Sequence, residues 1–171
     1  MPTPPEILED FESSILAIDP GTKESGYVTW NGKNILSFGK ISNCLLWDIV
    51  FIQNHPVVIE EINPYTMGMA IRDTILWSGQ FEGAVKARCG QCYYIPRREV
   101  RKHLCDSGGP KITDSVITQA LVDRFAYGQK NYGKGTKKEP GFFYGFKQDV
   151  WQAFALAVTW WDINKGRDKN V

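Results

Sequence analysis

Three carboxylates, Asp19, Glu60 and Asp149, stand where apolar segments of this 171-residue chain end or begin. Asp19 follows the apolar run 15–18, Glu60 follows the run 57–59, and Asp149 opens a long amphipathic stretch. Buried strands in one sheet bring the acids at their carboxyl ends to the same edge, and a helix packed on that sheet delivers the third. Three adjacent carboxylates repel one another unless a divalent cation neutralises them, and oxygen ligands select Mg²⁺ or Mn²⁺. The pattern predicts catalytic metal ligands suited to two-metal phosphodiester hydrolysis.

Each acid also has a structural alternative. Asp19 precedes Pro-Gly and suits a tight turn. Glu60 and its neighbour Glu61 point to opposite faces of a strand, so that one of them is free to be a solvated edge residue. Asp149 and Gln152 have the spacing of a capping box, in which the two side chains satisfy backbone N–H groups at a helix start. The coincidence of three acids at the expected element ends favours a shared site over three separate structural roles.

The elements that must position these acids follow from the apolar pattern. The pair Asn31-Gly32 is typical of a two-residue hairpin turn. Strands are predicted at 15–18, 26–30, 35–38, 57–60 and 92–95, and helices over about 45–52, 69–87, 97–104, 113–125 and 149–164. Three hairpin-linked strands followed by alternating helices and strands indicate an α/β fold with a mixed five-stranded sheet, its first three strands antiparallel, flanked by helices.

Composition places the chain among globular proteins. Hydrophobic residues make up 43% and charged residues 23%, which suits one domain. We predict an acidic, Pro-rich tail at 1–13, a single nuclease domain over 14–165, and a basic Gly-rich loop at 128–147 within it. No apolar run reaches the roughly 18–20 residues of a membrane span, and the N-terminus lacks the layout of a signal peptide. We therefore expect a cytoplasmic protein with no membrane partner and no small-molecule cofactor.

Charge is distributed unevenly along the chain. Residues 1–83 carry 4 Lys/Arg against 11 Asp/Glu, a net charge of −7, whereas residues 84–147 carry 13 against 5, a net charge of +8. Such asymmetry predicts a polyanion-binding surface beside an acidic region, and the alternative is ordinary surface charge that happens to be uneven. Lys and Arg neutralise phosphates, so the candidate nucleic-acid contacts are Arg97, Arg98, Arg101, Lys102, Lys111, Lys134, Lys137, Lys138 and Lys147.

Two further groups of residues have a chemical and a structural interpretation. Tyr132, Phe142, Phe143 and Tyr144 in the basic loop either stack on unpaired bases or pack into the core. Cys89, Cys92, His103 and Cys105 carry the atoms of a tetrahedral zinc site, but the His-x-Cys spacing is unusual for zinc modules, and simple packing is the alternative.

The residues around the three acids resemble those of the RuvC family of Holliday junction resolvases, which has the RNase H-like fold. The resemblance covers about residues 14–162 and is carried by Ile-Asp19-Pro-Gly with Gly26-Tyr27, by Val-Val-Ile-Glu60, and by Asp149-Val-Trp-Gln-Ala-Phe. The segments 97–105 and 136–141 are more similar to a branch found in phages and prophages. The resemblance implies a homodimer that nicks a four-way DNA junction using Mg²⁺, for which Mn²⁺ can substitute, in a bacterial host cell if the protein is phage-encoded.

The resemblance also assigns residues. Asp19 matches the family's first acid, Glu60 its second, and Asp149 an acid on the last helix. Gln152 stands where relatives commonly carry a further Asp, and its neutral amide is a weaker metal ligand, which leaves open whether the second metal site is complete. Tyr65 is the nearest substitute for the family's DNA-distorting aromatic residue. Arg101 and Lys111 are counterparts of a basic pair that grips phosphates.

The leading functional hypothesis is a crossover junction endodeoxyribonuclease, a metal-dependent enzyme that resolves four-way or other branched DNA. Two alternatives stay open. One is an RNase H-like ribonuclease acting on RNA or an RNA–DNA hybrid through the same metal chemistry. The other is a non-catalytic junction-binding protein in which Gln152 marks an incomplete site. The helix over 69–87, with Met69, Trp77 and Phe81, either forms the dimer interface or faces the core.

Overall fold

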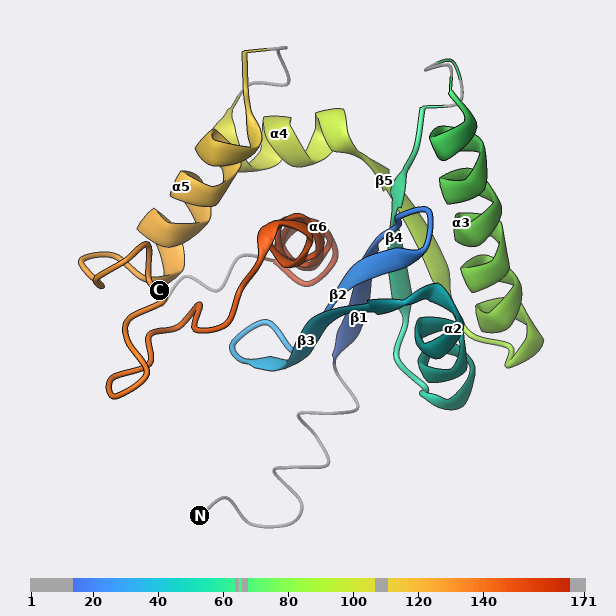
Figure 1. Cartoon of the computed structure of the whole chain (residues 1–171), viewed down its shortest axis with the longest axis horizontal. Coiled ribbons are helices and arrows are strands. Elements are labelled where there is room, and N and C mark those ends of the chain that lie inside the picture. Colours follow the sequence, from blue (N-terminus) through green and yellow to red (C-terminus); the bar gives the residue numbers. More distant parts are fainter. Residues whose placement is uncertain (1–13, 64, 66–67, 107–110, 167–171) are drawn as a thin grey trace.

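The structure, a computed structural model, describes residues 14–63, 65, 68–106 and 111–166, and the predicted tail at residues 1–13 lies outside them. Its elements are β1 (Ile15–Asp19), β2 (Glu24–Trp30), β3 (Ile35–Ser42), α2 (Asn43–Ile52), β4 (Val57–Glu61), α3 (Met69–Ala87), β5 (Cys92–Pro96), α4 (Arg97–Cys105), α5 (Asp114–Phe125) and α6 (Gln148–Asn164). The strands form one five-stranded sheet in the order β3-β2-β1-β4-β5 (Figure 1). Strands β1, β2 and β3 pair antiparallel, and β4 pairs parallel to both β1 and β5. The predicted mixed α/β sheet is confirmed.

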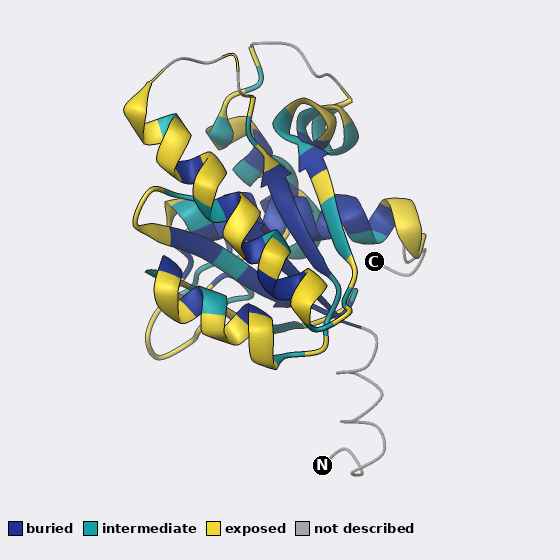
Figure 2. Ribbon diagram, turned by 90° about the vertical axis from the view of Figure 1, so that its right-hand side faces the viewer, coloured by how far each residue is buried: buried dark blue, intermediate teal, exposed yellow. Residues whose placement is uncertain are grey.

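The central strand β1 is buried on both faces because helices cover both sides of the sheet (Figures 1 and 2). Ile15 and Ala17 belong to the core on the side of α6, whereas Leu16 and Ile18 belong to the core formed with α2 and α3. This alternation follows from the two-residue period of a strand. Among the described helices, none is long and apolar enough to cross a membrane.

Helix α6 is buried around its whole circumference rather than on one face. All residues from Val150 to Trp160 are buried. The sheet covers one side of α6, and α4 and α5 lie on the other side (Figure 1). A helix that is apolar on every side is stable only in such a sandwiched position. The helix that carries Asp149 is therefore held rigidly against the sheet.

The basic loop at 128–147 packs its aromatic residues into the core. Phe143 and Phe146 are buried, and Phe143 contacts Trp151 with ring centroids 4.4 Å apart. Phe142 packs partly buried against this core. The core interpretation is therefore correct for Phe143, whose burial leaves no face for a base, and the partly buried Phe142 packs against the same core. Tyr132 and Tyr144, from the same loop, are exposed.

The connection between β2 and β3 differs from the predicted two-residue turn. Trp30 pairs with Ile35, and the register shifts between Thr29 and Trp30, so the connection comprises the four residues 31–34. The side chain of Asn31 accepts hydrogen bonds from the backbone N–H groups of Lys33 and Asn34 and so stabilises this longer loop.

Candidate active site

The fold brings the three predicted acids to one edge of the sheet. Asp19 is the last residue of β1, and Glu60 lies beside it on β4, because Ile18 pairs with Ile59 in the parallel register. Asp149 lies in the first turn of α6. That turn rests on Gly26, which is paired with Asp19 across β1 and β2. Glu60 is buried and Glu61 is exposed, so Glu60 is the member of the pair that faces the site.

Gly26 allows α6 to approach the sheet closely. A Cβ atom at this position would lie 2.5 Å from the carbonyl oxygen of Asp149 and 2.7 Å from its carbonyl carbon. Both are backbone atoms, so a side-chain rotation cannot relieve the clash. The absence of a side chain at Gly26 therefore sets the position of Asp149.

Replacing Gly26 by Ala is expected to push the first turn of α6 away from β2. Overpacking of this kind costs about 1–3 kcal/mol, and the nuclease activity that the sequence predicts should fall with it because Asp149 moves. Thermal unfolding and a nuclease assay on the same protein measure the two effects. Gly79→Ala, in α3, is the matched control because its added Cβ meets nothing within 4 Å. Unchanged stability and activity in Gly26→Ala would contradict this role.

Asp19 lies in a strongly negative environment. Burial raises the pKa of Asp19 well above its usual range, and the charge of Glu60 raises it further. Arg97 acts in the opposite direction, while Asp149 and a hydrogen bond with Glu60 add to the increase. A bound cation would reduce the mutual repulsion among the three acids.

Two basic side chains partly neutralise the outer acids. Lys40, on β3, places its Nζ 2.5 Å from Oδ2 of Asp149. Arg97 donates from Nη1 to both carboxylate oxygens of Glu60, at 3.1 and 3.2 Å, and from Nη2 to Asp114. Burial lowers the pKa of Arg97, but Glu60 and Asp114 outweigh it and the net change is upward. Arg97 therefore stays charged between two acids.

The donor set fits a hard divalent cation by its chemistry. Asp19, Glu60 and Asp149 offer only carboxylate oxygens, which Mg²⁺ and Mn²⁺ prefer. In the part of the chain that the structure describes, however, no three His, Cys, Asp or Glu side chains are arranged so as to hold one metal ion. In this structure Glu60 is instead bonded to Arg97, and Asp149 to Lys40.

The hydrogen bonds near Asp19 and Asp149 differ from the two structural alternatives, a turn held by Asp19 and a helix cap formed by Asp149. The turn after Asp19 is held by a closed set of three hydrogen bonds. Gly21 N donates to Ser25 Oγ at 3.1 Å, Ser25 Oγ to Asn43 Oδ1 at 2.6 Å, and Asn43 Nδ2 to the carbonyl oxygen of Gly21 at 3.0 Å. At the start of α6 the capping position is Lys147, without a side-chain cap, so the predicted capping box of Asp149 and Gln152 is not formed.

The remaining predicted residues fall into two groups. Arg97, Arg98 and Tyr65 line a hollow together with Glu60. Lys147 directly precedes α6, and Gln152 is buried one turn after Asp149. The other predicted nucleic-acid contacts do not line the two described hollows that contain the acids. Arg101 and Lys134 are half-buried, and Lys102, Lys111, Lys137 and Lys138 are exposed.

Sequence reasoning missed two lysines of the site. Lys23 and Lys40 line one hollow with Asp19 and Asp149. Lys23 follows Asp19-Pro-Gly-Thr in the sequence, so its position just after the first acid was a usable signal. No local sequence pattern indicated Lys40, because its position opposite Gly26 depends on the register of β2 and β3.

The zinc interpretation of the cysteines finds no support in the described residues. All four cysteines are free, and none takes part in a metal-holding group there. His103 donates from Nε2 to Asp162 at 2.7 Å, which gives it a structural partner.

The sheet order and the flanking helices define the fold as that of RuvC, as the sequence resemblance implied. A solved structure of Thermus thermophilus RuvC matches with a TM-score of 0.64 at 15% identity, covering 90% of this chain and 97% of that chain. T. thermophilus RuvC in complex with a Holliday junction substrate matches with a TM-score of 0.60 at 14% identity, covering 86% and 92%. No protein-family model and no curated protein sequence matches the chain. The likeness is therefore one of fold.

Proposed function

We propose that this protein is a metal-dependent, structure-selective DNA endonuclease that resolves four-way or other branched DNA junctions. The observation that carries the proposal is the meeting of Asp19, Glu60 and Asp149 at one edge of a RuvC fold, where Glu60 and Asp149 both raise the pKa of Asp19. A buried cluster of acids that repel one another lowers the stability of a protein. Such a cluster is therefore expected mainly at functional sites, where it binds a cation.

The three acids would hold Mg²⁺, with Mn²⁺ as a substitute. Bound there, the metal would supply an activated water and positive charge for the phosphorus centre. In the net reaction the water oxygen bonds to phosphorus, one P–O ester bond breaks, and the departing oxygen takes up the proton that the water gives. The chain's own residues bind and orient the phosphate, and Arg97 is the best placed of them because it already lies against Glu60.

The DNA path that we propose runs over both hollows at this edge. Lys23 and Lys40 line the hollow with Asp19, and Arg98 and Tyr65 line the hollow with Glu60. Phosphate contacts position a duplex, and an exposed aromatic ring is available to stack on a base where strands separate. The outer basic residues, Arg101, Lys102, Lys111, Lys134, Lys137, Lys138 and Lys147, would contact the junction arms.

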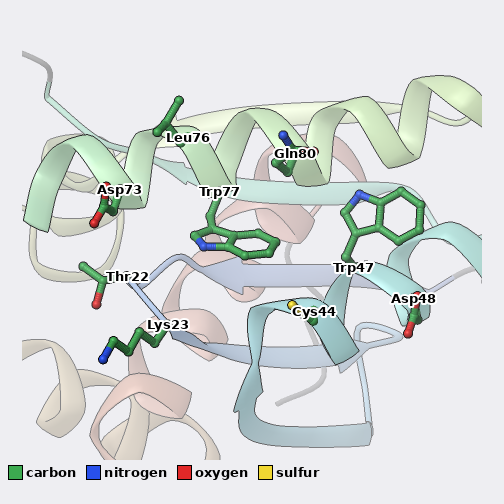
Figure 3. Close-up of a pocket in the computed structure, with 9 residues that line it drawn as sticks. All are labelled: Thr22, Lys23, Cys44, Trp47, Asp48, Asp73, Leu76, Trp77 and Gln80. Carbon is green, nitrogen blue, oxygen red and sulfur yellow. The ribbon is translucent and has the colours of Figure 1, made fainter.

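We further propose that the protein is a homodimer. Trp47 of α2 and Trp77 of α3 line a cavity of about 640 Å³ between these helices (Figure 3). Leu76, which also lines the cavity, and Met69 of α3 are exposed, whereas Phe81 belongs to the core. Exposed apolar side chains at a hollow favour a protein partner, and a two-fold dimer would place two sites on one junction.

The deciding experiment compares a labelled mobile four-way junction with linear duplex and with an RNA–DNA hybrid, each with Mg²⁺ or Mn²⁺. Paired, symmetric nicks in the junction alone are the expected result. Cleavage of the hybrid instead would assign the protein to ribonucleases. Tight junction binding without cleavage under any metal would establish a binding protein.

A further inference from the structure

Lys40 lies on the side of the site where the fourth acid of RuvC relatives is replaced. Its Nζ is 2.5 Å from Oδ2 of Asp149, and it lines one hollow with Asp19 and Asp149. Gln152 lies one helical turn after Asp149 on α6 and is only 7% exposed. Residues three apart share a helix face, so a neutral amide stands beside Asp149 where a carboxylate would complete a second ion site.

The position of Lys40 is fixed by the fold. Lys40 is paired with Gly26 across β2 and β3, and the first turn of α6 rests on Gly26. Because Gly26 has no side chain, the lysine reaches across it to Asp149. Lysine is an ammonium ion at neutral pH, and the carboxylate of Asp149 lies 2.5 Å from the Nζ of Lys40.

Basic side chains already neutralise part of the acid charge at this edge of the sheet, because Lys40 is paired with Asp149 and Arg97 with Glu60. A second divalent ion bound at Asp149 would lie against the ammonium group of Lys40, and the two positive charges would repel each other.

We propose that Lys40 takes the place of the second metal ion, so that the three acids would hold one divalent cation while the Lys40 ammonium contacts the phosphate beside Asp149. This inference rests on the proposed nuclease function. Lys40 is then a catalytic residue, since its charge stabilises the negative charge that grows on the phosphate oxygens during hydrolysis.

The first test counts Mn²⁺ ions bound per chain by electron paramagnetic resonance of the full-length protein. We expect one ion for the wild type and two for the double variant K40M/Q152D, which removes the ammonium and restores the acid. Lys33→Met is the matched control, because Lys33 is an exposed lysine of the same hairpin at its far end. Two ions in the wild-type protein would overturn the proposal.

The second test compares junction cleavage with junction binding. Lys40→Met should lower the cleavage rate at least about 100-fold, as loss of one preorganised charge does, while the dissociation constant for the junction changes by less than about tenfold. Lys40→Arg should retain part of the rate, and Lys33→Met all of it. Wild-type cleavage by Lys40→Met would overturn the proposal.

The two measurements separate this proposal from the proposed function. A wild-type protein that cleaves no branched DNA but binds one Mn²⁺, and two in K40M/Q152D, would overturn the nuclease assignment and support the ion count. Cleavage with two bound ions would support the nuclease and overturn the role of Lys40.

Discussion

Replacing Asp19 by Asn is expected to abolish junction cleavage and, without metal, to raise the melting temperature. The loss of activity should exceed about 100-fold, because a metal ligand is removed and each 1.36 kcal/mol of lost transition-state stabilisation is tenfold in rate. The gain in stability follows because burial and the charge of Glu60 both oppose ionisation of Asp19. Each kcal/mol of relieved repulsion raises the melting temperature by about 2–4 °C in a chain of this size.

The stability gain should depend on pH. Since the pKa of Asp19 is raised in the folded protein, its ionised form destabilises the fold. The cost is absent in acid, where Asp19 is protonated, and grows as the pH rises through the unfolded value near 3.9 toward the folded value. The difference between Asp19→Asn and wild type should therefore be largest near neutral pH.

Mg²⁺ should reverse the order of stability, since it binds the wild type and stabilises it by mass action. Melting curves from pH 4 to 8, with and without Mg²⁺, test both statements. Asp123→Asn is the control, because Asp123 is an exposed acid on α5 and lines neither of the hollows that contain the three carboxylates. A lower melting temperature for metal-free Asp19→Asn at pH 7 would contradict the account.

Replacing Asp162 by Ala is expected to cause a large loss of stability. The Asp162 side chain is 2% exposed and accepts from Arg124 at 2.6 and 2.9 Å and from His103 at 2.7 Å, which joins α6 to α5 and α4. Removing one partner of a buried ion pair costs about 3–5 kcal/mol. The melting temperature should fall by roughly 6–20 °C, since 1 kcal/mol corresponds to about 2–4 °C at this length.

The contribution of Asp162 should also vanish in acid. Burial raises the pKa of Asp162, but hydrogen bonds from Arg124 and His103 outweigh it and hold the pKa below its usual value. Its stabilisation is thus complete above the unfolded pKa and is lost as the pH falls through the lower, folded pKa. Denaturant unfolding of the wild type, Asp162→Ala and Asp162→Asn, from neutral pH down to below the unfolded pKa of Asp, measures this loss of stabilisation.

The matched control is Asp123→Asn, because Asp123 is an exposed acid on α5. It should leave the free energy of unfolding within about 0.5 kcal/mol of wild type, as surface substitutions do. If Asp162→Ala proved as mild as this control, the buried network would have no stabilising role.

The sequence by itself determined the sheet and the placement of the three acids. Uninterrupted apolar runs at 15–18 and 57–59 are long enough for strands and too short for helices, and each is followed by an acid. Once both runs are buried strands of one sheet, Asp19 and Glu60 must lie at the same edge. The apolar residues that follow Asp149 placed it in the same way, because the helix that they form had to cover the sheet.

The tertiary structure alone decided the partners of those acids. Lys40 lies opposite Gly26 because the connection at 31–34 has four residues, with a register shift before it, whereas the pair Asn31-Gly32 predicted only a two-residue turn. Arg97 bonds to both Glu60 and Asp114, which lie too far from it in the sequence for a local pattern to predict the contacts. Strand register and helix packing depend on many weak contacts between distant segments, so the sequence indicated where the carboxylates lie but not which basic residues neutralise them.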